Sequence, residues 1–114
     1  IITHTGLTDD FENEGQLMAE SVAAWLDQEW MPQEVHMRMG QCAKGVLIQL
    51  LTDKNKETVE VADVMMGISD TLHGRWSEYN DDAFVNAWDI GNYCADYLVN
   101  RMGGEKCACS TEIV

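Results

Sequence analysis

Apolar residues recur at intervals of three and four along most of the chain, which is the spacing that places side chains on one face of an α-helix. The sequence contains four such stripes and no useful length of the strict alternation that is typical of a β-strand. We therefore expect an all-α fold with four helices. The first stripe predicts a helix from residue 11 to about residue 30 and consists of Phe11, Met18, Val22, Trp25, Leu26 and Trp30.

Capping residues and a proline mark the ends of this first helix. Asp9 and Glu12 have the three-residue spacing of a capping box. Pro32 stops the helix because proline has no N–H to donate, and it is tolerated at the first position of the next helix. The second helix should therefore start after a very short turn and end near residue 52. Its stripe consists of Val35, Met39, Cys42, Ala43, Val46, Leu47, Leu50 and Leu51.

The third helix comes after a polar loop at residues 53–56 and is expected to begin near Glu57, with acidic side chains where the helix dipole favours them. The polar residues 80–82 should end it and cap the fourth helix. The third stripe consists of Val61, Val64, Met65, Ile68, Leu72 and Trp76.

The fourth helix should end at Gly103 and Gly104, which are typical of a left-handed C-cap. Helices of about 20 residues joined by short loops lie antiparallel to their neighbours, which predicts an up-down-up-down four-helix bundle over residues 1–104. Residues 105–114 show no period and are expected to form a loose tail. The fourth helix has an apolar side of Phe84, Trp88, Gly91, Ala95, Leu98 and Met102 and a polar side of Asn86, Asp89, Asn92 and Asp96.

Length and charge narrow the classes of function. The 114 residues suffice for one domain, and 46% apolar with 24% charged residues is ordinary for a globular protein. No apolar run approaches the roughly 18 residues that cross a bilayer, so we expect no membrane insertion. The net charge of −13 argues against nucleic acid and anionic lipid as partners, because both bind Lys and Arg. A basic protein partner, mimicry of DNA and simple solubility remain as explanations.

The chain begins at Ile1 without a Met, so we expect a missing or processed N-terminus and no readable targeting signal. The cysteines also lack a zinc pattern. Cys42 and Cys94 lie on apolar stretches and are expected to pack as small hydrophobic side chains. Cys107 and Cys109 form a Cys-x-Cys pair in the tail, for which a functional thiol or metal role stays open.

The histidines do not match a di-iron bundle, which needs two Glu-x-x-His pairs. His4, His36 and His73 all lack that spacing, so we expect surface or hydrogen-bonded core side chains.

Acidic residues at the start of the third helix allow a metal-binding alternative. Glu60 and Asp63 resemble the Glu-x-x-Asp half of the magnesium site in all-α nucleoside-triphosphate pyrophosphohydrolases of the MazG type. This resemblance implies a Mg²⁺-dependent hydrolase with Glu57, Glu60 and Asp63 as ligands, since carboxylates suit Mg²⁺. The second helix has Glu34 as its one acid, so Glu20 or Glu29 would have to complete the site. A solvated acidic start to the helix explains the same residues.

A second resemblance covers all four predicted helices. Residues 29–36 (EWMPQEVH) and 82–92 (DAFVNAWDIGN) resemble a small helical family of cyanobacteria and plastids without an assigned role. The resemblance implies a cytoplasmic or stromal setting and an accessory role beside the photosynthetic machinery. It implies no catalytic residues.

One end of the predicted bundle gathers aromatic side chains from two turns. Trp and Met are frequent anchors of protein interfaces. We therefore expect a non-enzymatic interaction or assembly module without a cofactor, whose partner is a basic protein or a second copy of the chain. The alternative is that the aromatic residues only seal the core. The expected partner-binding residues are Trp30, Met31, Trp76 and Tyr79, with Glu34, Glu78, Asp81 and Asp82 around them.

Overall fold

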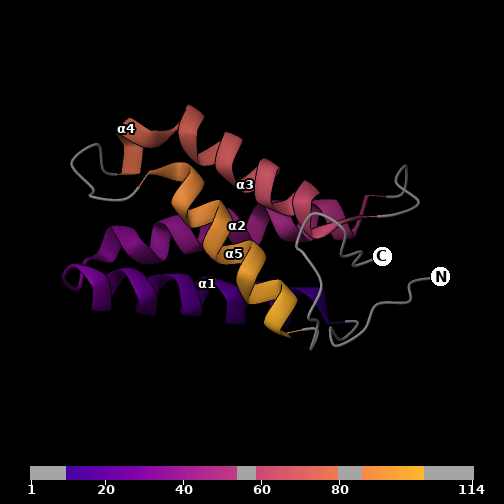
Figure 1. Cartoon of the computed structure of the whole chain (residues 1–114), viewed down its shortest axis with the longest axis horizontal. Coiled ribbons are helices and arrows are strands. Elements are labelled where there is room, and N and C mark those ends of the chain that lie inside the picture. The colour runs from indigo at the N-terminus through magenta and orange to yellow at the C-terminus, as the bar shows by residue number, and fades with distance from the viewer. Residues whose placement is uncertain (1–9, 54–58, 80–85, 102–114) are drawn as a thin grey trace.

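The computed structural model describes residues 10–53, 59–79 and 86–101. Helices account for 86% of these residues, and this part of the chain contains no strand. The prediction of an all-α fold is therefore confirmed. The helices are α1 (Phe11–Glu29), α2 (Glu34–Leu51), α3 (Val61–Gly74), α4 (Trp76–Tyr79) and α5 (Ala87–Arg101) (Figure 1).

The turn between α1 and α2 differs in detail from the prediction. The N-cap of α1 is Asp10, whose carboxylate accepts a hydrogen bond from Asn13 N at 3.1 Å, while Asp9 lies outside the described residues. Pro32 does not open α2, because Gln33 is the N-cap. Gln33 N instead donates to Asp27 Oδ1 at 3.2 Å, so the chain is tied back to α1 before α2 begins.

The third predicted helix is divided in two, which corrects the expectation of one helix from Glu57 through Trp76. α3 begins only at Val61 because Glu60 is its N-cap, and Val59 and Val64, both buried, occupy the two positions of a hydrophobic staple. α3 ends at Gly74, since glycine is a poor helix former, and the chain resumes as α4 after Arg75. Glu57 lies outside the described residues.

The buried face of α5 keeps Gly91, Ala95 and Leu98 of the predicted stripe but differs from it elsewhere. Trp88 was expected in the core but is 46% exposed, whereas Ile90 and Cys94 are fully buried. Asn86 and Asp89 cap the helix reciprocally, each backbone N–H donating to the other side chain at 2.9 Å, which places the helix start later than expected. Phe84 and Met102 lie outside the described residues. The predicted polar side, Asn86, Asp89, Asn92 and Asp96, is exposed as expected.

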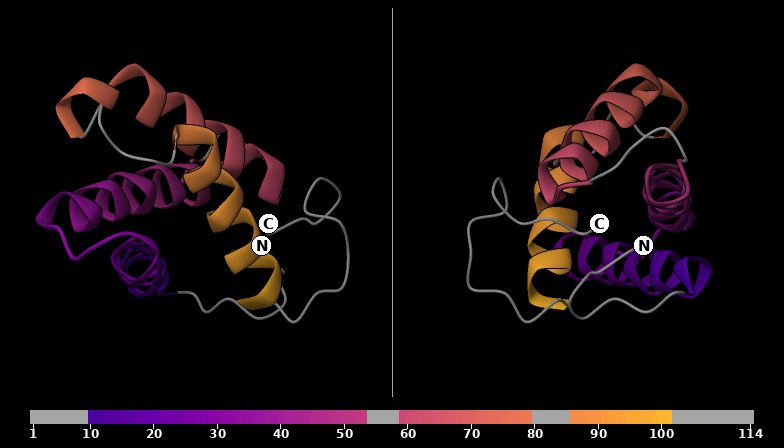
Figure 2. Two further views of the ribbon diagram at one scale, coloured as in Figure 1. Left: turned by 60° about the vertical axis from the view of Figure 1, so that its left-hand side comes forward. Right: turned by 90° about the vertical axis from the view of Figure 1, so that its right-hand side faces the viewer.

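The helices pack as two linked pairs. α1 packs on α2, α3 packs on α5, and α2 joins the pairs by packing on α3. The left view of Figure 2 shows α1 nearly end-on with α2 lying across the picture, and the right view shows α2 nearly end-on with α1 lying across it, so these two helices cross obliquely. The largest fully buried apolar side chains come from all four long helices and include Met18, Leu26, Met39, Leu47, Ile68, Leu72, Ile90 and Leu98.

Several side-chain contacts tie α1 to α5, among them a hydrogen bond between the hydroxyls of Ser21 and Tyr93. The Trp25 and Tyr93 rings stack with their centroids 4.4 Å apart. Trp25, which the predicted stripe placed on the apolar face, is half-buried. Arg101 donates two hydrogen bonds to the carboxylate of Glu14, at 3.1 and 3.0 Å. None of the helices in the described part of the chain is both long and apolar enough to cross a membrane.

Candidate functional site

The α1–α2 turn exposes two adjacent large apolar side chains. Trp30 is 37% exposed and Met31 is 51% exposed. The other large apolar side chains exposed in the described part of the chain, Leu17, Met66 and Trp88, lie on three different helices. The turn is therefore the place where two such side chains are neighbours in the sequence.

A polar clasp fixes the conformation of this turn. Asp27 Oδ1 lies 2.6 Å from Nδ1 of His36 and also accepts the hydrogen bond from Gln33 N. The hydrogen bond with His36 is the main reason why the pKa of Asp27 is lowered below 3.8, with a smaller contribution from Gln33. The His36 ring is buried and lies 6.4 Å from the Trp30 ring. His36 is thus a hydrogen-bonded core histidine, which is one of the two environments expected for the histidines.

The second half of the predicted partner-binding corner lies on α4. Figures 1 and 2 place α4 and the α1–α2 turn at the same end of the molecule. Trp76 is half-buried and packs against the core, so it contributes less exposed surface than Trp30. Tyr79 ends the short helix, and its side chain lies outside the described part of the structure. Of the four predicted rim acids, Glu34 and Glu78 are exposed, and Asp81 and Asp82 lie outside the described residues.

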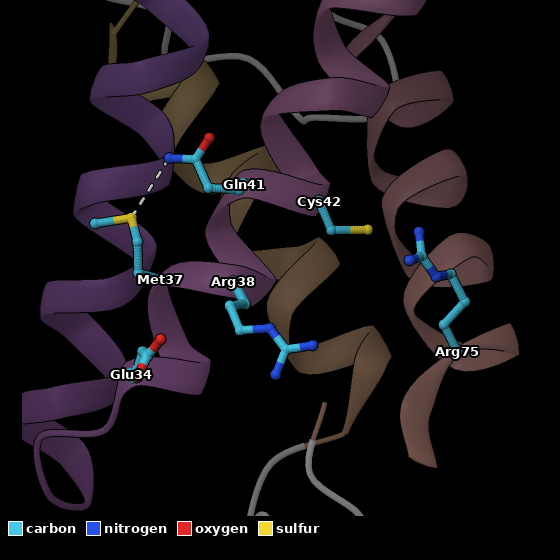
Figure 3. A pocket seen from close by; sticks show the side chains of 6 residues that line it. All are labelled: Glu34, Met37, Arg38, Gln41, Cys42 and Arg75. Carbon is cyan, nitrogen blue, oxygen red and sulfur yellow. Dashed lines mark hydrogen bonds between the residues drawn. The ribbon is translucent and has the colours of Figure 1, made fainter. Parts of the chain in front are cut away.

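A pocket of about 460 Å³ lies beside this turn (Figure 3). Its α2 residues lie along one face of the helix at helical spacing, and its opposite wall comes from the residue between α3 and α4. No local sequence pattern links position 75 to α2, so the pocket could not be predicted from the sequence. The lining residues are Glu34, Met37, Arg38, Gln41, Cys42 and Arg75.

Two arginines and one glutamate are the charged residues that line the pocket. Arg38 reaches into it from α2 and Arg75 from the opposite side, with the Cys42 thiol between their positions (Figure 3). Arg75 Nε also lies 3.5 Å from Glu78 Oε2. The other two cations of the described chain lie elsewhere: Lys44 pairs with Glu12, and Arg101 pairs with Glu14.

The two cysteines with described positions have different environments. Cys94 is fully buried, as predicted, and burial raises the pKa of its thiol to about 12. Cys42 packs against the core, but it is only half-buried and its side chain also lines the pocket. α2 presents Cys42 on the edge of its buried face, because Met39 and Ala43 fill the centre. Cys107 and Cys109 lie outside the described residues, as does His4, and His73 is exposed on α3.

Of the acidic residues named for the metal-binding alternative, Glu60 and Asp63 form the N-terminal cap of α3. Glu60 N donates to Asp63 Oδ2 at 2.9 Å, and the Glu60 side chain accepts from the backbone N–H of Asp63. Among the described residues, no three His, Cys, Asp or Glu side chains come together in a way that could hold a metal ion. Glu20 and Glu29 are exposed on α1 and do not join Glu60 and Asp63 in such a group.

No protein-family model, curated protein or solved structure matches the chain. A functional assignment therefore depends on the geometry of the turn and of the pocket.

Proposed function

We propose that this chain is a non-enzymatic helical interaction or assembly module that binds a protein partner through Trp30 and Met31. The observation that carries the proposal is the exposure of both side chains on a turn that the Asp27–His36 clasp holds in place. An anchor that is already ordered loses little conformational entropy on binding, which favours association. Trp and Met are also enriched in protein interfaces.

The charge of the chain favours a basic partner. The net charge of −13 attracts a cationic surface over distances comparable to the Debye length of about 8 Å at physiological salt. Glu34 and Glu78 contribute negative charge at the same end of the molecule as the exposed turn. The acidic surface would set the rate of encounter, and the apolar anchor would set the lifetime of the complex. A second copy of this chain lacks that attraction and is the alternative occupant.

The proposal also covers the order of the helices and the cellular location of the chain. We propose that α1, α2, α3 and α5 succeed one another in up-down-up-down order within a unit of residues 1–104, with residues 105–114 as a tail. Alternating helices bring the α1–α2 turn and α4 to one end. From the resemblance to the cyanobacterial and plastid family alone, we propose a cytoplasmic or stromal setting beside the photosynthetic machinery.

The proposal is tested by comparing two tryptophan variants. Trp30→Ala removes the proposed anchor, and Trp88→Ala removes a tryptophan of similar exposure on a different helix. The wild-type chain and both variants are immobilised and used to capture proteins from lysate of the source organism, and sedimentation measures self-association. We expect capture by the wild type and by Trp88→Ala, loss of the same proteins with Trp30→Ala, and weaker capture at high salt.

Two outcomes would contradict the proposal. If all three chains capture the same proteins equally, Trp30 is not the anchor. If Trp30→Ala lowers the free energy of unfolding by roughly 3–5 kcal/mol, the range for a buried aromatic residue, and leaves association intact, Trp30 only seals the core. Loss of self-association in Trp30→Ala without loss of a heterologous partner would identify a second copy of the chain as the occupant.

A further inference from the structure

The pocket beside α2 has an arginine on each of two opposite sides and less polar surface on α2. Arg38 and Arg75 approach it from α2 and from the α3–α4 junction, while Met37 and Cys42 supply less polar surface on α2 (Figure 3). Two of the seven Lys and Arg residues of a strongly acidic chain therefore border one cavity. A guanidinium group presents N–H donors in a planar fork that matches the two oxygens of a carboxylate or phosphate.

The size of the cavity argues for an organic ligand over a bare ion. The pocket is a shallow depression that is open to solvent, and its volume of about 460 Å³ lies within the range of roughly 300–1,000 Å³ that is typical of small-molecule sites. A bare inorganic anion would leave most of this space and the surface of Met37 unused.

The local balance of charges favours a carboxylate over a phosphate. Glu34 also lines the pocket and Glu78 Oε2 lies 3.5 Å from Arg75 Nε, so these carboxylates offset much of the positive charge of the two arginines. A phosphate monoester carries about −1.5 to −2 at neutral pH and a monocarboxylate −1, so the monocarboxylate needs less positive charge to offset it. We propose that this pocket binds a small organic monocarboxylate, whose carboxylate lies between Arg38 and Arg75 and whose organic part contacts Met37 and Cys42. This site is separate from the proposed Trp30 and Met31 anchor and does not depend on it.

Cys42 provides a direct test because its thiol lies in the pocket. Iodoacetate and iodoacetamide both alkylate a thiolate: a carbon–sulfur bond forms, the carbon–iodine bond breaks and iodide leaves. The two reagents differ in that iodoacetate carries a carboxylate. The ratio of their rates at Cys42, monitored by mass spectrometry, is compared between the folded chain and the chain unfolded in urea. We expect the ratio of iodoacetate to iodoacetamide to be at least about tenfold higher in the folded chain, because charge-assisted hydrogen bonds hold the anionic reagent.

Variants identify the groups responsible. Arg38→Gln and Arg75→Gln should each return the ratio toward the unfolded value, while Arg38→Lys, which keeps the charge but loses the fork, should give an intermediate ratio. Gln49→Glu is the matched control, since it makes the same change in net charge at an exposed position of α2 that does not line the pocket. Circular dichroism and thermal melting check that each variant is folded, and Arg75→Lys replaces Arg75→Gln if that variant unfolds.

Competition completes the test. At constant ionic strength, butanoate should slow the reaction of Cys42 with iodoacetamide in a saturable way, and phosphate should protect more weakly. An equal ratio in folded and unfolded chains, or a ratio that Arg38→Gln and Arg75→Gln leave unchanged, would overturn the site. Phosphate protection that is as strong as that of butanoate would overturn its assignment to carboxylates.

Discussion

A methyl group at position 40 would collide with the backbone of α1. A Cβ atom built on Gly40 lies 2.5 Å from Ala19 O and 3.1 Å from both Ala19 C and Ala19 Cα. Backbone atoms cannot move aside by changing a rotamer, so α1 and α2 would have to separate. The two helices cross at this point with Met39 and Ala43 fully buried beside it. Gly40→Ala should therefore destabilise the protein.

The magnitude comes from two opposing effects. Overpacking of a well-packed interior costs about 1–3 kcal/mol, and contact with rigid backbone places Gly40→Ala near the upper end. Alanine in a helix interior is about 1 kcal/mol more favourable than glycine. The net loss is therefore about 2 kcal/mol. Gly45→Ala in the same helix has the higher helix propensity of alanine without overpacking, because its added Cβ meets no atom within 4 Å. This variant should therefore stabilise the protein by about 1 kcal/mol.

Urea unfolding monitored by far-ultraviolet circular dichroism measures both variants. The difference between Gly40→Ala and Gly45→Ala should be about 3 kcal/mol, with opposite signs relative to the wild type. For a chain of 114 residues, Gly40→Ala should lower Tm by about 8 °C. If Gly40→Ala proved as stable as Gly45→Ala, α1 and α2 would not approach each other at this glycine and the crossing of the two helices would be wrong.

Three further predictions concern pH, thiols and metal. Because the pKa of Asp27 is lowered in the folded chain, its hydrogen bonds stabilise the fold above pH 3.8, and this stabilisation is lost as pH falls through the folded pKa. Asp27→Asn should therefore make Tm less dependent on pH in that acidic range. Cys94 should resist iodoacetamide in the native protein while Cys42 reacts, because Cys94 is fully buried and its burial raises its pKa to about 12, whereas the Cys42 side chain is half-buried and lines the open pocket; rapid labelling of both in a mass-spectrometric time course would contradict the described core. Asp63→Asn should lower Tm through loss of the cap with Glu60, and by the same amount with and without millimolar Mg²⁺, whereas a real metal site would raise Tm of the wild type when Mg²⁺ is added.

Local patterns were sufficient for the features that depend on neighbours in the sequence. The 3.6-residue spacing predicted the four long helical segments, because an amphipathic helix carries its own periodicity wherever it packs. The proximity of Glu60 to Asp63 could also be predicted, since residues three apart at a helix start can cap each other. Metal ligation and helix capping can use the same spacing of acidic residues, and only the three-dimensional arrangement shows that Glu60 and Asp63 form a cap.

The rotation of each helix depends on its packing partners. Trp88 and Ile90 are both large and apolar, and periodicity alone can place either in the core. The packing of α5 on α3 buries Ile90, with Gly91 against Met65 O and Ser69, and leaves Trp88 exposed. The pocket has the same origin, because Arg75 approaches the exposed stripe of α2 only through the packing of α2 on α3.

The ion pair between Glu14 and Arg101 depends most clearly on the three-dimensional fold. Glu14 belongs to the first turn of a helix in an acidic chain, and glutamate side chains are ordinarily exposed to solvent. It is 1% exposed, because Arg101, 87 residues away, donates two hydrogen bonds to its carboxylate. A buried charge is tolerated only beside an oppositely charged partner, and no periodicity or composition indicates which residue that partner will be. Local sequence was enough to locate the helices, whereas the packing of distant segments determined which of their charges could be buried.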